Sequence, residues 1–463
     1  MILNRFLSAG AGGMASQAIA LAALPVLSRQ YSQADLGTWA VWLGGTMIVG
    51  TIAGLRLDLA VVTTQDHSDA ATLVWIVLGL GLMAALALGG LATVPMVQGW
   101  LGTAHSPWLG VLSAPMALAL TIQQVGQAWL TRHGRFWAQS LAQVLLALVV
   151  TGCQVGLGWH QPTASGLILG SLIGQGVAAL VLVVACLPSR HRPGRPGALW
   201  PVVQPHLNFP KYSATYTFFG LLRDRAGILI LQSFLSAAQV GQYAYIWRSL
   251  YFPVGLVSGA LRPVVFHDCA RTGVASAKEQ VLRILGLLSA GTGLGLVAFL
   301  AMPGDWFALV FGPHWREAGP VGACVVWGAA TFLLANWLDR VMDVLGRQRL
   351  TLMMEIVFST LSLGGMILAF KMGAGFLGAV LVQSIALVVY NAVYLVAVFR
   401  CAQWPLADLG RALLPGLWWG GLGSIVLAIL LQLMPPWPAM GVFAALSIMM
   451  MARGVTSALR PER

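Results

Sequence analysis

The chain has 463 residues, of which 58% are hydrophobic and only 9% are charged. A water-soluble protein of this length could not cover its surface with so few charges, and the apolar runs are too long for a buried soluble core. The net charge of +12 does not indicate a nucleic-acid partner, because its meaning depends on where the charges lie relative to a membrane. The composition predicts an all-α polytopic membrane protein.

The first predicted element is an apolar helix near the N-terminus. Met1 to Leu27 carry one early arginine and an apolar run, which a secretory signal peptide would also show. Gln17 interrupts the run and many further apolar segments follow, so we expect an uncleaved first transmembrane helix.

Apolar windows of about 18–25 residues, each long enough to cross a bilayer as a helix, continue along the whole chain. They predict about fourteen transmembrane helices; because only Met434-Pro435-Pro436 separates the last two, twelve helices plus a re-entrant hairpin is the alternative. The predicted spans are 4–28, 38–63, 71–95, 109–131, 137–157, 165–187, 213–235, 240–265, 281–302, 318–338, 351–370, 376–399, 412–433 and 437–453.

The basic residues predict the orientation of these helices. With a cytoplasmic N-terminus, most Lys and Arg fall in cytoplasmic segments, and only Arg29, Arg316 and Lys371 fall on the other side. An even number of helices then places both termini in the cytoplasm. The remaining basic residues lie within or at the edge of predicted helices, and they are Arg56, Arg223, Arg225, Arg248 and Arg262.

An internal repeat divides the chain into two halves. SQADLGTWA, which begins at Ser32, matches SAAQVGQYA, which begins at Ser236, at a constant offset of 204 residues. GLR, ending at Arg56, matches GALR, ending at Arg262, with a slip of one or two residues. We expect two homologous six-helix lobes with the same polarity in the membrane, which in transporters enclose a substrate site between them. The predicted parts are an N-lobe (1–187), a Pro- and Arg-rich cytoplasmic linker (188–212), a C-lobe (213–400), and two further helices with a short cytoplasmic tail (401–463).

Four stretches of the sequence resemble a known family. LPVLSRQYSQADLGTWA, GLRLDLAVV, RDRAGILILQSFLSAAQVGQYAYIWRSLYFP and FGPHWREAG resemble the O-antigen and exopolysaccharide lipid flippases. These form the polysaccharide-transporter branch of the multidrug/oligosaccharidyl-lipid/polysaccharide exporter superfamily. The resemblance covers most of the chain, but its motifs are diffuse.

The resemblance implies a two-lobed transporter in a bacterial inner membrane. Its implied substrate is a polyprenyl-diphosphate-linked oligosaccharide, moved from the cytoplasmic to the periplasmic leaflet through a cationic cavity. Membrane lipids are implied partners, with a lipid groove at the last two helices. Such a pathway also implies a polysaccharide polymerase and a chain-length regulator.

Charged residues inside predicted helices are candidate substrate ligands. An arginine near the bilayer centre costs at least ~2.5–3.5 kcal/mol, so such residues usually face a bundle interior or a pathway. Arg223 and Arg225 point about 200° apart on a helix, so we expect one of them to face the cavity while Asp224 pairs with a neighbouring helix. The alternative is an Arg223–Asp224 ion pair that only fixes packing.

Three further arginines occupy comparable positions. Arg56, beside Asp58, and its repeat partner Arg262 either face the cavity or extend to the interface. Arg248, in the outer half of its helix, is expected to face the cavity. Guanidinium groups suit a diphosphate because they pair with it in a bidentate manner and stay charged.

Glutamines form polar stripes on two neighbouring predicted helices. Gln123 and Gln127 are four residues apart, and Gln139 and Gln143 repeat this spacing. They either line a hydrated cavity and bind sugar hydroxyls, or form hydrogen bonds that join helices, at ~0.6 kcal/mol each.

No histidine lies within a predicted span, so any coupling to H⁺ or Na⁺ would depend on Asp58, Asp224 or Glu355. The five cysteines lack metal-site or disulfide spacing, and we expect no cofactor and no metal site.

Two other functions compete with a flippase. A multidrug or small-cation antiporter of the same superfamily would need acidic cavity residues, whereas the excess here is basic. A polysaccharide polymerase or glycosyltransferase would need catalytic loops, and the largest external loop, 303–319, shows no recognisable spacing among Asp305, His314 and Glu317. We expect no enzyme activity.

Overall fold

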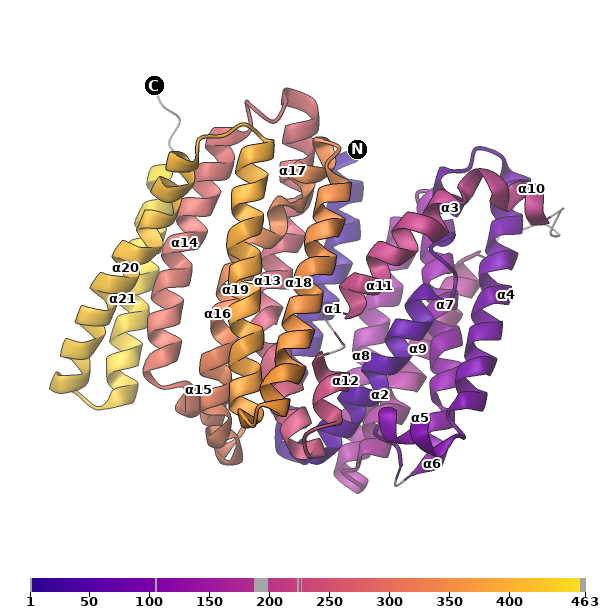
Figure 1. The fold of residues 1–463 in the computed structure, drawn as a ribbon, viewed down its shortest axis with the longest axis horizontal. Coiled ribbons are helices and arrows are strands. Elements are labelled where there is room, and N and C mark those ends of the chain that lie inside the picture. The colour runs from indigo at the N-terminus through magenta and orange to yellow at the C-terminus, as the bar shows by residue number, and fades with distance from the viewer. Residues whose placement is uncertain (1, 105, 187–198, 223–224, 226, 459–463) are drawn as a thin grey trace. The chain divides into compact units, whose positions relative to one another are not determined.

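The computed structural model describes residues 2–104, 106–186, 199–222, 225 and 227–458. All regular secondary structure in this part of the chain is helical, as predicted, and it forms two compact units, residues 1–245 and 246–463 (Figure 1). Two helices that follow the predicted lobe boundary at residue 213, α11 (Thr215–Leu221) and α12 (Gly227–Gln232), contact α2 (Gln33–Ile52) in the first unit.

The first unit is built from long helices connected by short ones. Helix α8 packs against α1 and α9, and α7 packs against α2, α4 and α9. Leu57, Val61, Val74, Val77 and Trp129 belong to one buried cluster that holds α3, α4 and α7 together. The helices not yet given bounds are α1 (Ile2–Gln30), α3 (Asp58–Thr63), α4 (His67–Leu91), α5 (Pro95–Trp100), α6 (Pro107–Val111), α7 (Ser113–Arg132), α8 (Phe136–His160), α9 (Ala164–Cys186), α10 (Leu199–Val203), η1 (Gln204–His206), η2 (Phe209–Ala214) and α13 (Ala237–Thr272), whose later part lies in the second unit.

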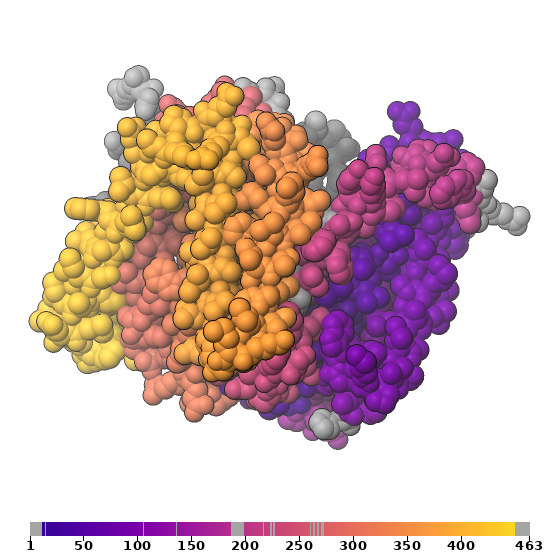
Figure 2. Space-filling view, in the orientation of Figure 1, coloured from indigo at the N-terminus to yellow at the C-terminus, as the bar shows by residue number. Residues whose placement is uncertain are grey.

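The second unit packs α14 against α20, and α19 against both α16 and α18. Helix α20 exposes Leu417 (75%) and Trp418 (70%), an apolar surface suited to lipid contact (Figure 2 shows this helix with α21 at the edge of the unit). The remaining helices are α14 (Lys278–Ala301), α15 (Pro303–Phe311), η4 (Pro313–Ala318), α16 (Gly319–Ala335), η5 (Asn336–Leu338), α17 (Asp339–Val344), α18 (Gln348–Lys371), α19 (Gly375–Cys401), α20 (Leu406–Leu433) and α21 (Pro436–Ala458).

Nine helices in the described ranges are long and apolar enough to cross a membrane, which makes the chain a multi-pass membrane protein. The predicted count of fourteen spans is not confirmed. One reason is that the predicted span 38–63 is interrupted.

This interruption corrects the expectation of one continuous helix over 38–63. Helix α2 ends at Ile52 and α3 begins at Asp58. Between them Leu55 and Arg56 have φ angles of 50° and 58°, in the left-handed region that non-glycine residues rarely adopt. The apolar pattern could not reveal this break, because the residues on both sides of it, such as Ile52 and Leu57, are still apolar.

The two repeats begin in the same way. Ser32 caps α2, where its Oγ accepts a hydrogen bond from Asp35 N at 3.1 Å. Ser236 precedes α13, where its Oγ accepts from Gln239 N at 3.4 Å and its own N donates to Gln239 Oε1 at 3.2 Å. A serine thus caps the helix at matching positions of the repeat, and at Ser236 the reciprocal bond to Gln239 completes a capping box.

The two capped helices cross at a pair of repeat-related glycines. A Cβ atom built on Gly37 would lie 1.9 Å from the Ala237 carbonyl oxygen and 2.8 Å from Gly241 N. A Cβ built on Gly241 would lie 1.8 Å from the Gln33 carbonyl oxygen and 2.6 Å from Gly37 N. No side chain fits at either position, so α2 and the start of α13 contact each other backbone to backbone.

Candidate functional site

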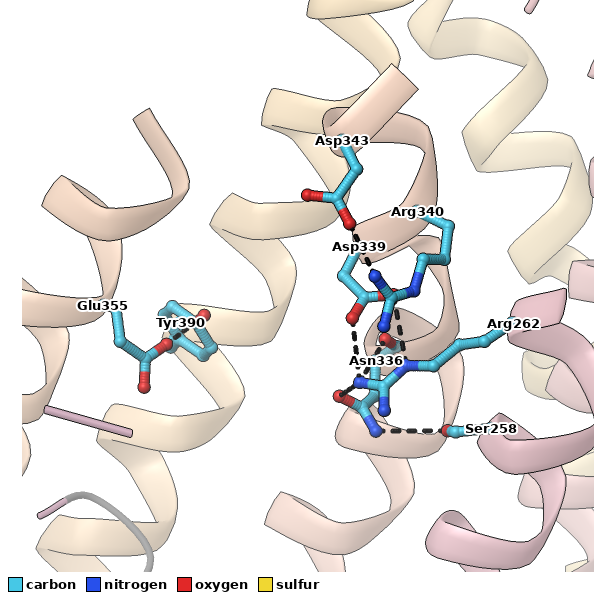
Figure 3. Close-up of polar contacts among 8 residues, drawn as sticks. All are labelled: Ser258, Arg262, Asn336, Asp339, Arg340, Asp343, Glu355 and Tyr390. Carbon is cyan, nitrogen blue, oxygen red and sulfur yellow. Dashed lines mark hydrogen bonds and ion pairs between the residues drawn. The ribbon is translucent and has the colours of Figure 1, made fainter. Parts of the chain in front are cut away.

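A cluster of polar side chains surrounds Arg262 on α13. Arg262 Nε donates to Asp339 Oδ1 at 3.1 Å, and Nη2 lies 3.0 Å from Asp339 Oδ2, a bidentate ion pair (Figure 3). Nη2 also donates to the Asn336 carbonyl at 3.2 Å and to Asn336 Oδ1 at 2.8 Å. Asn336 Nδ2 in turn donates to Ser258 Oγ at 3.1 Å, which returns the network to α13.

The end of α16 explains why these groups are available. Helix α16 ends at Ala335, and the chain then passes through the 3-10 turn η5 into α17. This change of helix geometry leaves the Asn336 carbonyl oxygen available to a side chain. Asn336 and Asp339 are three residues apart and so present their side chains to the same neighbour.

A second arginine completes the cluster. Arg340 Nη1 donates to Asp343 Oδ2 at 2.8 Å, and Arg340 Nε lies 3.8 Å from Asp339 Oδ1. The two arginines and two aspartates have formal charges that cancel. Their side chains are between 25% and 41% exposed, so the cluster is partly open to its surroundings.

Helix α13 places another predicted arginine on the same face as Arg262. Arg248, Gly255, Gly259 and Arg262 lie within about 60° of one another around the helix axis, at 100° per residue. The arginines are separated by about 21 Å along the helix. Arg248 and both glycines are exposed, and a Cβ built on Gly259 would have no neighbour within 4 Å in the described part of the chain. We call this face the α13 stripe.

Arg56, the repeat partner of Arg262, has different surroundings. It lies in the break between α2 and α3, where its Nε is 3.8 Å from Asp58 Oδ1, beyond hydrogen-bonding distance. The Arg56 side chain is 22% exposed, and its buried Nε has no hydrogen-bond partner among the described residues. Asp58 is 7% exposed.

The charged triplet is described only at Arg225, since Arg223 and Asp224 lie outside the described residues. Arg225 lies between α11 and α12 and is half-buried. A Cβ built on Gly44 of α2 would lie 3.9 Å from Arg225 Cβ, so this arginine lies beside α2.

The predicted glutamines take part in contacts between helices. Gln139 Nε2 of α8 donates to Thr131 Oγ1 of α7 at 2.6 Å and to the Gln127 carbonyl. Gln123 Oε1 accepts a hydrogen bond from Gln175 of α9. A Cβ built on Gly13 of α1 would lie 3.3 Å from the side-chain oxygen of the fourth glutamine, Gln143. Their binding of sugar hydroxyls stays a prediction.

Glu355 lies in a separate buried polar group. It is 3% exposed, and its Oε2 accepts a hydrogen bond from Tyr390 of α19 at 2.8 Å. Ser359 and Ser362 follow on the buried face of α18, and on α19 Asn391 Nδ2 donates to Thr331 Oγ1 at 3.0 Å. Figure 3 shows Glu355 and Tyr390 apart from the Arg262 cluster.

Sequence reasoning missed most partners in these clusters, namely Ser258, Asn336, Asp339, Asp343, Gln175 and Tyr390. One signal was present, because Asn336 and Asp339 fall together at the end of the apolar window 318–338. Nothing in the local pattern pairs them with Arg262, which is more than seventy residues away.

Comparisons with known proteins identify the fold and a family. A family model described as "Polysaccharide biosynthesis protein" matches residues 26–320. A solved structure of the lipid II flippase MurJ in an inward closed conformation has a TM-score of 0.76 at 12% identity, with 97% of this chain and 98% of that chain covered.

Multidrug transporters share the fold less closely. An inward-facing MATE family transporter of the MOP superfamily gives a TM-score of 0.66 at 12% identity, with 84% and 94% of the two chains covered. A eukaryotic MATE transporter gives 0.55 at 12% identity, with 89% and 98% covered. No curated protein sequence matches the chain. At these identities the structural likeness shows the fold alone.

Proposed function

The chain belongs to the family of polysaccharide biosynthesis proteins, and from that premise we propose that it is a lipid-linked oligosaccharide flippase. The proposed substrate is a polyprenyl-diphosphate-linked O-antigen or exopolysaccharide repeat unit. The protein moves it from the cytoplasmic to the periplasmic leaflet of a bacterial inner membrane, with both of its own termini in the cytoplasm. The protein is a transporter and catalyses no bond chemistry.

The α13 stripe is the observation that carries this proposal. A diphosphate must take its negative charge through a region of low dielectric, where charge is costly unless it is paired. Arg248 and Arg262 provide two permanently charged groups about 21 Å apart on one helix face. The exposed glycines between them leave room for a substrate to approach the backbone, since no atom of the described residues lies within 4 Å of a Cβ built on Gly259.

The other predicted ligands have supporting roles in this proposal. Arg56, Arg223 and Arg225 add positive charge along the route, while Gln123, Gln127, Gln139 and Gln143 hydrogen-bond sugar hydroxyls. The two lobes alternate access to the two leaflets, as transporters built from repeats do. If H⁺ or Na⁺ drives the cycle, Asp58, Asp224 and Glu355 are the coupling candidates, and Glu355 is supported by its burial and its Tyr390 hydrogen bond.

Deletion of the gene tests the proposal in cells. Lipid-linked oligosaccharide should accumulate on the cytoplasmic leaflet, and surface polysaccharide should be lost. A polymerase and a chain-length regulator would then lack their substrate on the periplasmic side. Normal surface polysaccharide in a deletion strain without a paralogue would refute the proposal.

Variants of the stripe test the observation itself. Arg248→Ala and Arg262→Ala should not restore export to the deletion strain at wild-type protein levels. Arg411→Ala is the matched control, because this arginine is 77% exposed and its partner Asp408 retains Lys278 at 2.5 Å.

A multidrug antiporter is the second candidate, favoured by the fold shared with MATE transporters. Such a protein binds cationic compounds, for which the arginines of the stripe are unsuitable partners. Export of cationic dyes by the purified protein in vesicles, unaffected by Arg262→Ala, would favour this candidate over the flippase.

A further inference from the structure

The guanidinium of Arg262 is occupied on one edge only. Its Nε and Nη2 bind Asp339 and Asn336, whereas Nη1 donates no hydrogen bond within the described part of the chain. The side chain is 33% exposed. An incoming anion can therefore reach a free N–H edge while the Asp339 carboxylate still holds the other edge.

Asp339 lies between two arginines. It is bidentate to Arg262, and its Oδ1 is also 3.8 Å from Arg340 Nε. Arg340 is already anchored by Asp343 at 2.8 Å, so its guanidinium is held next to Asp339. Asp339 therefore has a second guanidinium within 4 Å that can pair with it when Arg262 binds another anion.

We propose that Asp339 is an internal competitor for the substrate diphosphate: it occupies Arg262 when the site is empty, and it transfers to Arg340 when a diphosphate binds. This inference rests on the flippase proposal and deepens it. It assigns Arg262 as the diphosphate ligand, Asp339 as the group displaced, and Arg340 with Asp343 as the group that accepts the displaced carboxylate.

The charges explain why such an exchange is useful. A diphosphate carries more negative charge than one carboxylate and can also bind two guanidinium edges, so it can displace Asp339. If Arg262 had no internal partner, it would hold the diphosphate more tightly and release it more slowly. The competing carboxylate weakens binding while keeping the empty site neutral, which favours turnover over affinity.

The location of the cluster also fits substrate entry. Val341 and Met342 of α17 belong to the same buried core as Ala277 and Val281 at the start of α14 and Phe399 at the end of α19. The predicted topology places this end of the helices in the cytoplasmic leaflet, where the substrate is made. Arg262 would thus meet the diphosphate first, and Arg248, further along the α13 stripe, later.

The test is diphosphate binding to the purified full-length protein in detergent. Farnesyl diphosphate is the probe, farnesol is the control, and isothermal titration calorimetry at low salt is the measurement. Asp339→Asn should bind the probe about tenfold more tightly than wild type, the equivalent of one charge-assisted hydrogen-bonded pair. Asp305→Asn, which removes a carboxylate paired with Arg316 outside this cluster, should bind like wild type.

Arg340 provides a second and opposite readout. Arg340→Gln should bind farnesyl diphosphate several-fold more weakly, because the displaced carboxylate loses its acceptor. The same change made in the Asp339→Asn background should have no effect. A purely structural role for these residues would not give opposite signs, and thermal unfolding in the same buffer identifies any variant that fails to fold.

The outcomes separate this inference from the flippase proposal. If wild type binds the probe and folded Asp339→Asn binds it equally or more weakly, Asp339 is not a competitor and the flippase proposal stands. If neither wild type nor Asp339→Asn binds it better than farnesol, both proposals are contradicted.

Discussion

Arg56 and Arg262 occupy matching positions in the two repeats, yet the local backbone conformation differs between them. Arg262 lies within an uninterrupted helix and is bidentate to Asp339, with Asn336 as a further partner. Arg56 lies in a break with positive φ and only approaches Asp58 at 3.8 Å. The same short motif therefore produces a bound guanidinium in one repeat and a loosely held one in the other.

The beginnings of the two repeats show no such difference. Ser32 and Ser236 cap their helices alike. A side chain at Gly37 would clash with the backbone of α13, and one at Gly241 would clash with the backbone of α2. Of these two pairs of matching regions, only the arginine-bearing ends differ. We interpret this as two separate roles. The shared glycine contact fixes how α2 and α13 cross, and each arginine position serves a different step of the proposed transport cycle.

The largest expected effect comes from the shared crossing. Gly37→Ala and Gly241→Ala should each destabilise the protein by about 3 kcal/mol or more, because the new methyl group would overlap main-chain atoms that cannot move aside singly. Thermal unfolding in detergent measures the loss. Gly79→Ala is the control, since a Cβ there meets nothing within 4 Å. Wild-type stability of either crossing variant would show that the helices do not meet in this way.

The next effect concerns the triplet on the chain between α11 and α12. Arg223→Ala and Arg225→Ala should abolish polysaccharide export without lowering the protein level, because they remove positive charge from the proposed route rather than from the core. Surface polysaccharide and membrane protein content are measured together. Normal export by both variants would remove the triplet from the substrate-binding set.

A smaller effect should separate Arg56 from Arg262. Arg262→Ala should lower stability by about 1 kcal/mol, since it removes a bidentate pair that is one-third exposed. Arg56→Ala should change stability less, because its contact with Asp58 is too long for a hydrogen bond. Asp339→Asn added to Arg262→Ala should restore part of the loss. Equal costs for the two arginines would show that the protein holds them equally strongly.

Effects no larger than that of Arg262→Ala are expected at the caps. Ser32→Ala and Ser236→Ala should each cost about 1 kcal/mol. Asp35→Ala should cost more than Gln239→Ala, because Asp35 Oδ1 also accepts a hydrogen bond from Ala164 N of α9 at 2.8 Å. Thermal unfolding of the four variants checks this order, and a costlier Gln239→Ala would reverse it.

The sequence predicted the features that depend on local pattern. Apolar windows located most long helices, and the match of Ser32 with Ser236 predicted the repeat and its equivalent helix starts. The backbone break at Leu55 and Arg56 was not predictable, because GLR and GALR differ too little to show that one helix stops while the other continues. The backbone conformation at each motif therefore depends on the tertiary packing around it.

Much of the candidate site could not be predicted either, because it also depends on tertiary contacts between distant segments. The placement of the predicted arginines as substrate ligands stays a prediction, and the partner of Arg262, Asp339, comes from a distant segment that no local pattern links to it. The two interpretations of the glutamines could not be separated from spacing alone, since a polar stripe has the same period whether it faces water or a neighbouring helix.

Translocation in reconstituted vesicles tests the central claim most directly. Purified protein is incorporated into liposomes that carry a polyprenyl-diphosphate-linked oligosaccharide, and its appearance on the opposite leaflet is followed with a membrane-impermeant glycosidase. We predict that wild type and Arg411→Ala accelerate this movement, whereas Arg248→Ala and Arg262→Ala leave it near the rate of protein-free liposomes. Wild-type vesicles no faster than protein-free ones, or stripe variants as fast as wild type, would contradict the account.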